Sequence, residues 1–174
     1  MNTRKALRGL SFFVLIQMII HTKKDEFATH IIEKLSTTSY EEFLPQIENI
    51  AKKTLVFNNE VDYNFRQQSL KKLAEDFDTF DNIKLPGFRT TYYPNFLTIV
   101  LESEFIDGRY ITKDDPNTKI IYEELINRKS DWTFSSYSYH NFIINAKNEL
   151  YYIDIDDYKV VSQEKRLQLF HKFY

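Results

Sequence analysis

The side chains whose types and spacing suggest chemistry are Asn141, Asp154 and Asp156. Two apolar runs around the turn-forming residues 145–148 predict a β-hairpin, with Asn141 at its entrance and Asp154 at its exit. Asp156 is expected to point to the same face of an extended segment as Asp154. Amide and carboxylate oxygens are ligands that divalent cations accept, so these three residues predict a weak cation site.

A carboxylate pair offers an alternative chemistry, that of a minimal enzyme. The pair would be Glu102 with Glu104, or Asp154 with Asp156, because residues at this spacing share a face of a strand and shift each other's pKa. Nothing else in the sequence marks a substrate pocket, so this alternative has no further support.

The composition excludes several kinds of site. The chain has 174 residues, a net charge of −2 and no cysteine, which excludes disulfides, thiolate catalysis and cysteine-based zinc sites. A pI near 6.1 and mixed charges give no basic footprint for nucleic acid. The histidines lack the spacing of metal ligands; they are His21, His30, His140 and His171.

Glycine limits any nucleotide site. The only three glycines, Gly9, Gly87 and Gly108, lie far apart in the sequence. A loop that wraps phosphates needs glycines close together, because its backbone must approach the ligand closely. Any nucleotide site in this chain would therefore lack a glycine-rich loop.

The N-terminal third is predicted to be helical. The apolar run 10–20 follows basic residues but is shorter than the roughly 18–20 residues that span a bilayer, so we interpret it as a buried helix. Membrane contact through 10–20 and organelle targeting are the alternatives. Further helices are expected over 27–35, from its apolar spacing, and over 39–50, which opens with a capping box.

The rest of the chain is expected to mix helices and strands. Apolar residues at helical spacing predict a long amphipathic helix over 60–80. Residues 96–101 are dense in β-branched and large apolar side chains, which indicates a buried strand. A helix is expected over 115–128, opened by an Asp-Pro pair, and Ser162 is expected to cap a last helix.

No repeat or linker divides the sequence, so a single domain, 1–174, is expected. The predicted fold class is α+β, mainly helical with a small antiparallel sheet. Residues 1–54 would form a helical N-terminal extension and residues 55–174 the core.

Several segments, in order, resemble the UbiB/AarF family of atypical kinase-like proteins, which are associated with coenzyme Q biosynthesis. Residues 9–17 are similar to that family's helical GPTFxKxGQ signature, and residues 60–77 to its ELDY…E-A…F helix, the counterpart of the kinase αC helix. Residues 100–108 resemble its VLVMEFIDG hinge. Residues 134–141 fall where the family has FHADPHPGN, and residues 153–156 where it has IDFG.

This resemblance implies a protein-kinase-like fold, in which an Asn and an Asp flanking such a hairpin hold Mg²⁺ beneath the nucleotide phosphates. It would assign Mg²⁺ and ATP to Asn141 and Asp154, helped by Asp156. The segment between Lys53 and Glu60 is too short for the loop and strands that carry the nucleotide-binding Lys. We therefore expect 55–174 to be a kinase-like core with a reduced N-terminal lobe.

Departures from the family pattern affect the chemical residues. Val14 and Ile16 replace the Lys and Gly of the signature, and Arg66 lies about where the αC helix has its Glu. Ser136 replaces the catalytic-loop Asp, and Asp156 the Gly after the metal-binding Asp. An unactivated hydroxyl is a poor base near neutral pH, so phosphoryl transfer is not expected.

The predicted function is that of a pseudokinase, which is a catalytically inactive kinase-like protein. It would act as a binding or regulatory scaffold for a protein partner. It would bind Mg²⁺ or ATP weakly at most. The alternative is a small soluble interaction protein of immunity or inhibitor type, unrelated to kinases, whose 12 Tyr and 15 Phe would supply an aromatic binding surface. The expected location is cytoplasmic or membrane-associated.

Overall fold

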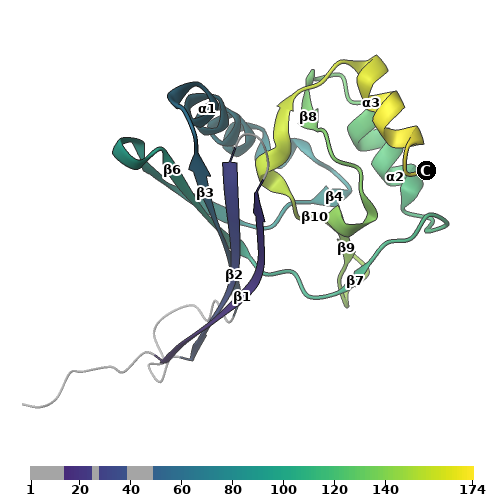
Figure 1. Ribbon diagram of the computed structural model, residues 1–174. Coiled ribbons are helices and arrows are strands. Elements are labelled where there is room, and N and C mark those ends of the chain that lie inside the picture. The colour runs from purple at the N-terminus through teal and green to yellow at the C-terminus, as the bar shows by residue number, and fades with distance from the viewer. Residues whose placement is uncertain (1–13, 25–27, 39–48) are drawn as a thin grey trace, which may run out of the picture.

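The computed structural model describes residues 14–24, 28–38 and 49–174 (Figure 1). The strands are β1 (Val14–Lys24), β2 (Ala28–Thr38), β3 (Asn49–Phe57), β4 (Ile83–Lys84), β5 (Phe88–Tyr93), β6 (Thr98–Glu104), β7 (Arg109–Tyr110), β8 (Trp132–Phe134), β9 (Phe142–Ile144), β10 (Leu150–Tyr152) and β11 (Tyr158–Val160). The α-helices of the described residues are α1 (Glu60–Asp76), α2 (Thr118–Ile121) and α3 (Gln163–His171).

The first unit is an antiparallel sheet with the strand order β1-β2-β3-β6-β5, covered on one face by α1 (Figure 1). Successive side chains of a strand point to opposite faces, so every second residue meets the helix. The buried residues of this layer are Leu55, Phe57, Ile99, Leu101, Tyr63, Leu70 and Leu73.

This alternation places Lys53 on the helix-covered face of the sheet. Lys53 is two residues before Leu55 and four before Phe57, both of which are buried. Its side chain is only 17% exposed. A cation in that position needs acidic partners, and the second unit supplies them.

The second unit contains a sheet of order β4-β10-β9-β7 and the strand pair β11-β8. Aromatic side chains fill its core, where the rings of Phe134 and Tyr152 are stacked with their centroids 4.0 Å apart. α2 continues into a π-helical turn, Tyr122–Ile126, against which α3 packs (Figure 1).

The expected mainly helical fold is wrong. Within the described residues the protein is mixed α/β, and its strands form three sheets. The described parts of 10–20 and 27–35 belong to β1 and β2, because pairing between strands outweighs the apparent helical spacing. Most of the helix predicted over 39–50 lies outside the described residues. The segment before Glu60, where the loop and strands of an N-terminal lobe were expected to be missing, instead contains β3, which carries Lys53 in a five-stranded sheet.

Several elements predicted from local signals are confirmed. The helix predicted over 60–80 is α1, and Asn59 accepts a hydrogen bond at its start from the Asp62 backbone N–H. The hairpin is β9 and β10, with Asn148 in the left-handed conformation within its turn. Ser162 caps α3, accepting from the Lys165 backbone N–H.

Two predicted elements are displaced. The strand expected over 96–101 begins at Thr98, because Phe96 ends a 3₁₀ turn. The helix expected over 115–128 begins at Thr118 and becomes π-helical at Tyr122. None of the described helices has the length and apolar character needed to cross a membrane.

Candidate functional site

Asp154 and Asp156 lie on the turn that follows β10, where the second unit faces the first. Asp154 precedes a 3₁₀ turn, Ile155–Asp157, whose first residue is buried in the core. The buried Ile155 anchors this turn between the two carboxylates. The Asp156 side chain is 4% exposed, whereas that of Asp154 is 34% exposed.

The two carboxylates share one ammonium group. Lys53 Nζ donates to Asp154 Oδ1 at 3.0 Å and to Asp156 Oδ1 at 2.5 Å. Lys53 comes from β3 of the first unit, and it is 101 and 103 residues away from these partners in the sequence. The ion pairs therefore join the two units directly.

A second cation approaches the same site from α1. Arg66 Nη1 lies 3.7 Å from Asp156 Oδ2. The four side chains thus form a network of two cations and two anions whose formal charges cancel. Such a network satisfies its own charges and gives no strong field for attracting a further ion.

The pKa values reflect this crowding. Burial alone would lower the pKa of Lys53, but the carboxylates of Asp156 and Asp154 outweigh it and raise that pKa. Burial raises the pKa of Asp154 to about 6; Lys53 opposes this rise, and the negative charges of Asp156 and Asp157 add to it. Asp154 therefore binds a proton more readily than an ordinary aspartate does.

Asn141 lies at the entrance of the hairpin, as predicted, but its side chain is engaged elsewhere. Asn141 Nδ2 donates to Ser136 Oγ at 2.8 Å. Its backbone carbonyl accepts from the Ile153 N–H at 2.9 Å. The backbone of Asn141 thus joins the open end of the hairpin to the chain just before Asp154. The side-chain amide of Asn141 is directed to Ser136 instead.

The neighbouring acid, Asp157, holds the same turn against the chain before Asn141. Its carboxylate accepts from the Ser135 backbone N–H at 2.9 Å and from Ser135 Oγ at 2.8 Å. Ser136, which the resemblance places at the catalytic-loop position, accepts from Tyr152 Oη through its carbonyl at 3.1 Å. These contacts fix the segment without presenting a carboxylate at Ser136.

The arrangement does not fit a bound Mg²⁺. A cation shared by Asp154 and Asp156 would have to displace the Lys53 ammonium, which already contacts both. In the part of the chain that the structure describes, no group of three or more His, Cys, Asp or Glu side chains is arranged to hold a metal ion.

The alternative pair, Glu102 and Glu104, lies on β6 away from this network. Both have the opposite parity to the buried Ile99 and Leu101, so they face away from α1. Glu102 is paired with Arg89 at 2.6 Å. The two glutamates therefore lie outside the junction between the units.

Lys53 and Arg66 were not predicted as partners of the acids. The alternation of Lys53 with Leu55 and Phe57 indicates a strand with one charged residue on its apolar face, and this is the one local signal that marks Lys53. Arg66 gives no such signal, because a single Arg on an amphipathic helix is common. Neither a protein-family model nor a curated protein sequence matches the chain.

Proposed function

We propose that this protein is a catalytically inactive kinase-like protein, resembling the UbiB/AarF family, that acts as a binding or regulatory scaffold. The observation that carries the proposal is the contact of Lys53 with both Asp154 and Asp156 across the junction of the two units. The order of β3, α1, the hairpin and Asp154 supports the kinase-like assignment. The ion pairs of Asp154 and Asp156 support the absence of catalysis.

The position of Lys53 supports the kinase-like assignment. Protein kinases carry the nucleotide-binding Lys on strand β3 and pair it with a Glu of the following helix. Here Lys53 is on β3, α1 follows directly, and Asp154 comes after the hairpin. Its contact with Asp154 joins the two positions that such a site would use.

Two of the departures from the family pattern compensate for each other. Arg66 stands about where the helix would carry an acid, and Asp156 stands where the family has Gly. In this protein Arg66 and Asp156 approach each other, and Asp156 also gives Lys53 a carboxylate partner. The acid that Lys53 needs comes from the second unit instead of the helix, so the charge balance is kept while the phosphate site is lost.

The same network argues against phosphoryl transfer. Phosphoryl transfer requires carboxylates that are free to hold Mg²⁺ and a base for the acceptor. Asp154 and Asp156 are engaged by Lys53 and Arg66, and Ser136 has no carboxylate. What the network does is hold the two units in one arrangement, which is the property that a scaffold needs.

The test is a thermal-shift titration with ATP and Mg²⁺, together with an assay for phosphoryl transfer and ATP hydrolysis. A ligand that binds only the folded protein must raise its apparent stability. We expect no turnover, and no Mg²⁺-dependent shift at millimolar ATP. Turnover that disappears in Asp154→Ala would contradict the proposal that the protein is inactive.

Two variants make a negative result informative. Lys53→Met removes the contact on which the proposal rests, and Asn141→Ala changes the same region without removing an ion pair. We expect Lys53→Met to lower the melting temperature more than Asn141→Ala, as a structural network requires. Equal melting temperatures for Lys53→Met and the unaltered protein would remove the scaffold role of the network.

A further inference from the structure

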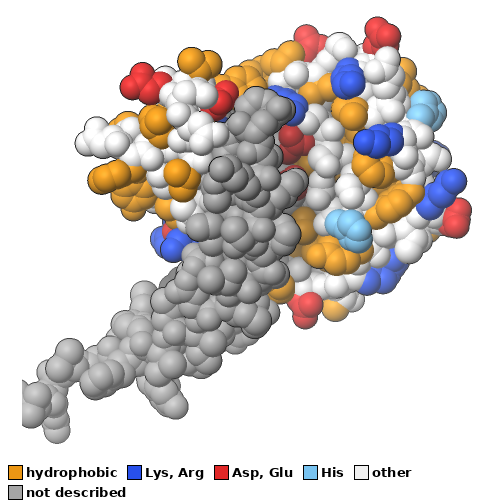
Figure 2. Space-filling model, viewed as in Figure 1, with side chains coloured by type: hydrophobic (Ala, Val, Ile, Leu, Met, Phe, Trp, Pro, Cys, Tyr) orange, Lys and Arg blue, Asp and Glu red, His pale blue; other side chains and the backbone are white. Residues whose placement is uncertain are grey.

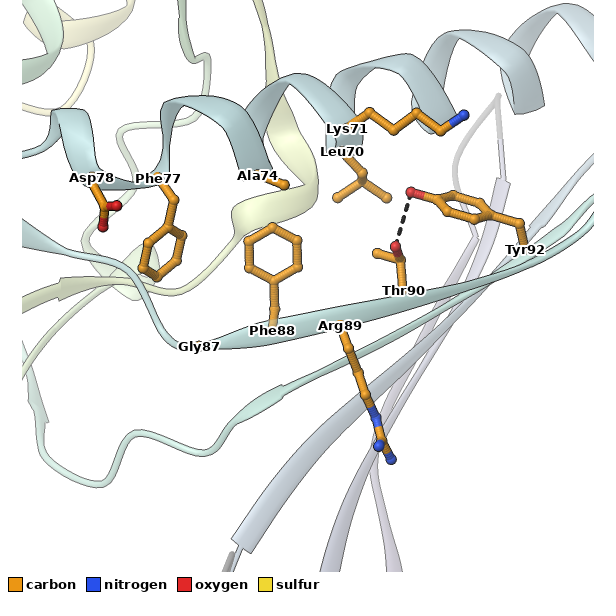
Figure 3. Close-up of a pocket in the computed structure, with 10 residues that line it drawn as sticks. All are labelled: Leu70, Lys71, Ala74, Phe77, Asp78, Gly87, Phe88, Arg89, Thr90 and Tyr92. Carbon is orange, nitrogen blue, oxygen red and sulfur yellow. Dashed lines mark hydrogen bonds between the residues drawn. The ribbon is translucent and has the colours of Figure 1, made fainter.

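A groove runs between α1 and strand β5, on the side of the first unit away from the ion-pair network (Figure 3). Its volume is about 520 Å³. The apolar and aromatic part of its lining consists of Leu70, Ala74, Phe77, Phe88 and Tyr92. Apolar surface concentrated in an open groove is typical of a binding site for another chain.

β5 supplies the backbone for such binding. It stands at the end of the strand order, and within the described residues it pairs only with β6. An edge strand presents unpaired N–H and C=O groups that can pair with an added strand. Phe88, Thr90 and Tyr92 alternate with exposed residues and point into the groove (Figure 3).

Charged side chains of opposite sign mark the ends of the groove. Lys71 lies near Tyr92, with its ammonium 5.8 Å from the ring centroid, and Asp78 lies at the other end, near Gly87 (Figure 3). Neither Lys71 nor Asp78 forms an ion pair within the described part of the chain. α1 ends at Asp76 and Asp78 lies in the 3₁₀ turn that follows, so the helical rise places Lys71 and Asp78 about 11 Å apart. This is close to the distance of about 13 Å between two residues that are four apart on one face of a strand.

We propose that this groove binds an extended peptide segment of a partner protein, which adds to β5 as a further strand. The peptide would direct an acidic side chain toward Lys71, an aromatic side chain over Ala74 and a basic side chain toward Asp78. Added antiparallel to β5, it would run from the Lys71 end to the Asp78 end. The proposal uses charge complementarity and an open strand edge, and it does not depend on the kinase-like assignment.

The first probe is the peptide acetyl-Glu-Thr-Phe-Thr-Lys-amide, titrated into the full-length ¹⁵N-labelled protein and followed by NMR. Its alternate residues present the acid, the aromatic ring and the base on one face. We expect shifts of the backbone amides of β5 and of residues 70–78. Replacing the Phe of the peptide by Ser should weaken binding about tenfold or more, because the buried ring supplies most of the apolar contact.

Matched variants locate the site. Ala74→Trp places a large side chain in the groove from the helix, and Gln68→Trp places the same side chain at an exposed position of α1 outside the groove lining. We expect Ala74→Trp to abolish the shifts and Gln68→Trp to leave them. Lys71→Glu should weaken binding of this peptide and restore binding of acetyl-Lys-Thr-Phe-Thr-Lys-amide.

Other outcomes would overturn the proposal. If Ala74→Trp binds the peptide as well as Gln68→Trp does, the peptide does not use the groove. If the protein self-associates in sedimentation experiments and Ala74→Trp makes it monomeric, the occupant is a second copy of this chain. If neither peptide shifts the β5 amides at millimolar concentration and self-association is absent, the edge strand does not accept a partner strand of this chemistry.

Discussion

Asp154 and Asp156 share one ammonium group but have different surroundings. Asp156 is almost fully buried and also faces Arg66, whereas Asp154 is about one-third exposed. A buried carboxylate that holds two cations should therefore contribute more to stability than a neighbour that water can reach.

Asp156→Asn should lower the free energy of unfolding by about 3 kcal/mol, because among the described residues it leaves Lys53 with one acid and Arg66 with none. Asp154→Asn should cost less than about 1 kcal/mol, because this side chain is partly solvated and its raised pKa shows that folding disfavours the charged form that Asn removes. Urea unfolding at pH 7 measures both. Equal losses would contradict the assignment of Asp156 as the principal partner.

The pKa of Asp154 gives a prediction on pH. Burial raises it from the ordinary value of 3.8 to about 6, so the folded protein binds more protons than the unfolded chain between these values. The free energy of unfolding of the unaltered protein should then fall, relative to that of Asp154→Asn, as the pH rises from about 4 to about 7. Parallel stability curves for the two proteins across this range would refute the raised pKa.

At the scale of single elements, the turn before β7 requires a residue without a side chain. A Cβ on Gly108 would collide with the carbonyl oxygen of Ile144 in β9 and with the Ile143 side chain. At Gly87, before β5, a Cβ would meet nothing within 4 Å. Gly87→Ala is therefore a matched control for Gly108→Ala.

Gly108→Ala should destabilise the protein by about 2–3 kcal/mol, because the backbone of β7 or β9 must move to make room. Gly87→Ala should change stability by less than about 1 kcal/mol. Thermal unfolding of both variants checks this. A neutral Gly108→Ala would mean that β7 and β9 can separate without loss.

Arg166 fixes α3 to the chain that leads into β8. Its guanidinium is buried and donates to the carbonyls of Val161 at 2.8 Å, Arg128 at 2.8 Å and Ser130 at 2.6 Å. Each of these carbonyls would lose a partner if the guanidinium were removed.

Arg166→Met should therefore lower the free energy of unfolding by about 3 kcal/mol or more, since it keeps much of the apolar stem but none of the donors. The exposed neighbour changed in the same way, Lys165→Met, is the control and should be nearly neutral. Denaturant unfolding compares the two. If Arg166→Met and Lys165→Met lost the same stability, the loss could not be due to the hydrogen bonds of the Arg166 guanidinium.

Elements with local signals were predictable from the sequence, and those set by distant partners were not. The hairpin could be predicted because its turn residues, including Asn148, specify it locally, and Ser162 marks the start of α3 in the same way. β2 carries apolar residues at a spacing that also fits a helix, and only its pairing with β1 and β3 makes it a strand.

For the same reason, the sequence predicted the acidic residues of the site but not their cationic partner. Asp154 and Asp156 were marked by the hairpin that precedes them. Their partner Lys53 is about 100 residues earlier, and nothing near it in the sequence specifies an acid. The strand that carries Lys53 was expected to be missing because the segment between Lys53 and Glu60 is short, but β3 extends back to Asn49.

At the scale of the whole molecule, one hydrophobic core spans both units, and polar side chains of α1 and β3 add contacts to the second unit. One of these contacts is the network of Lys53 with Asp154 and Asp156. Another is the hydrogen bond from Tyr158 Oη to Asp76 Oδ2 at 2.7 Å, at the end of α1. Burial would raise the pKa of Asp76, but Lys72 and Tyr158 outweigh it and lower that pKa.

These contacts should make the two units unfold together. Trp132 is the only Trp and lies in the second unit, so its fluorescence follows that unit while far-UV circular dichroism follows both. The two signals should coincide in the unaltered protein and separate in the double variant Asp156→Asn, Tyr158→Phe. Signals that separate already in the unaltered protein would mean that the junction does not couple the units.

The position of β4 has a consequence for the order in which the protein can be completed. β4 lies between α1 and β5 in the sequence but pairs with β10, which comes after every strand of the first sheet. During synthesis, β4 and Lys53 emerge from the ribosome long before their partners exist. Contacts between such distant residues form slowly. The buried Lys53 of the first unit therefore gains its acidic partners only after nearly the whole chain has been synthesised.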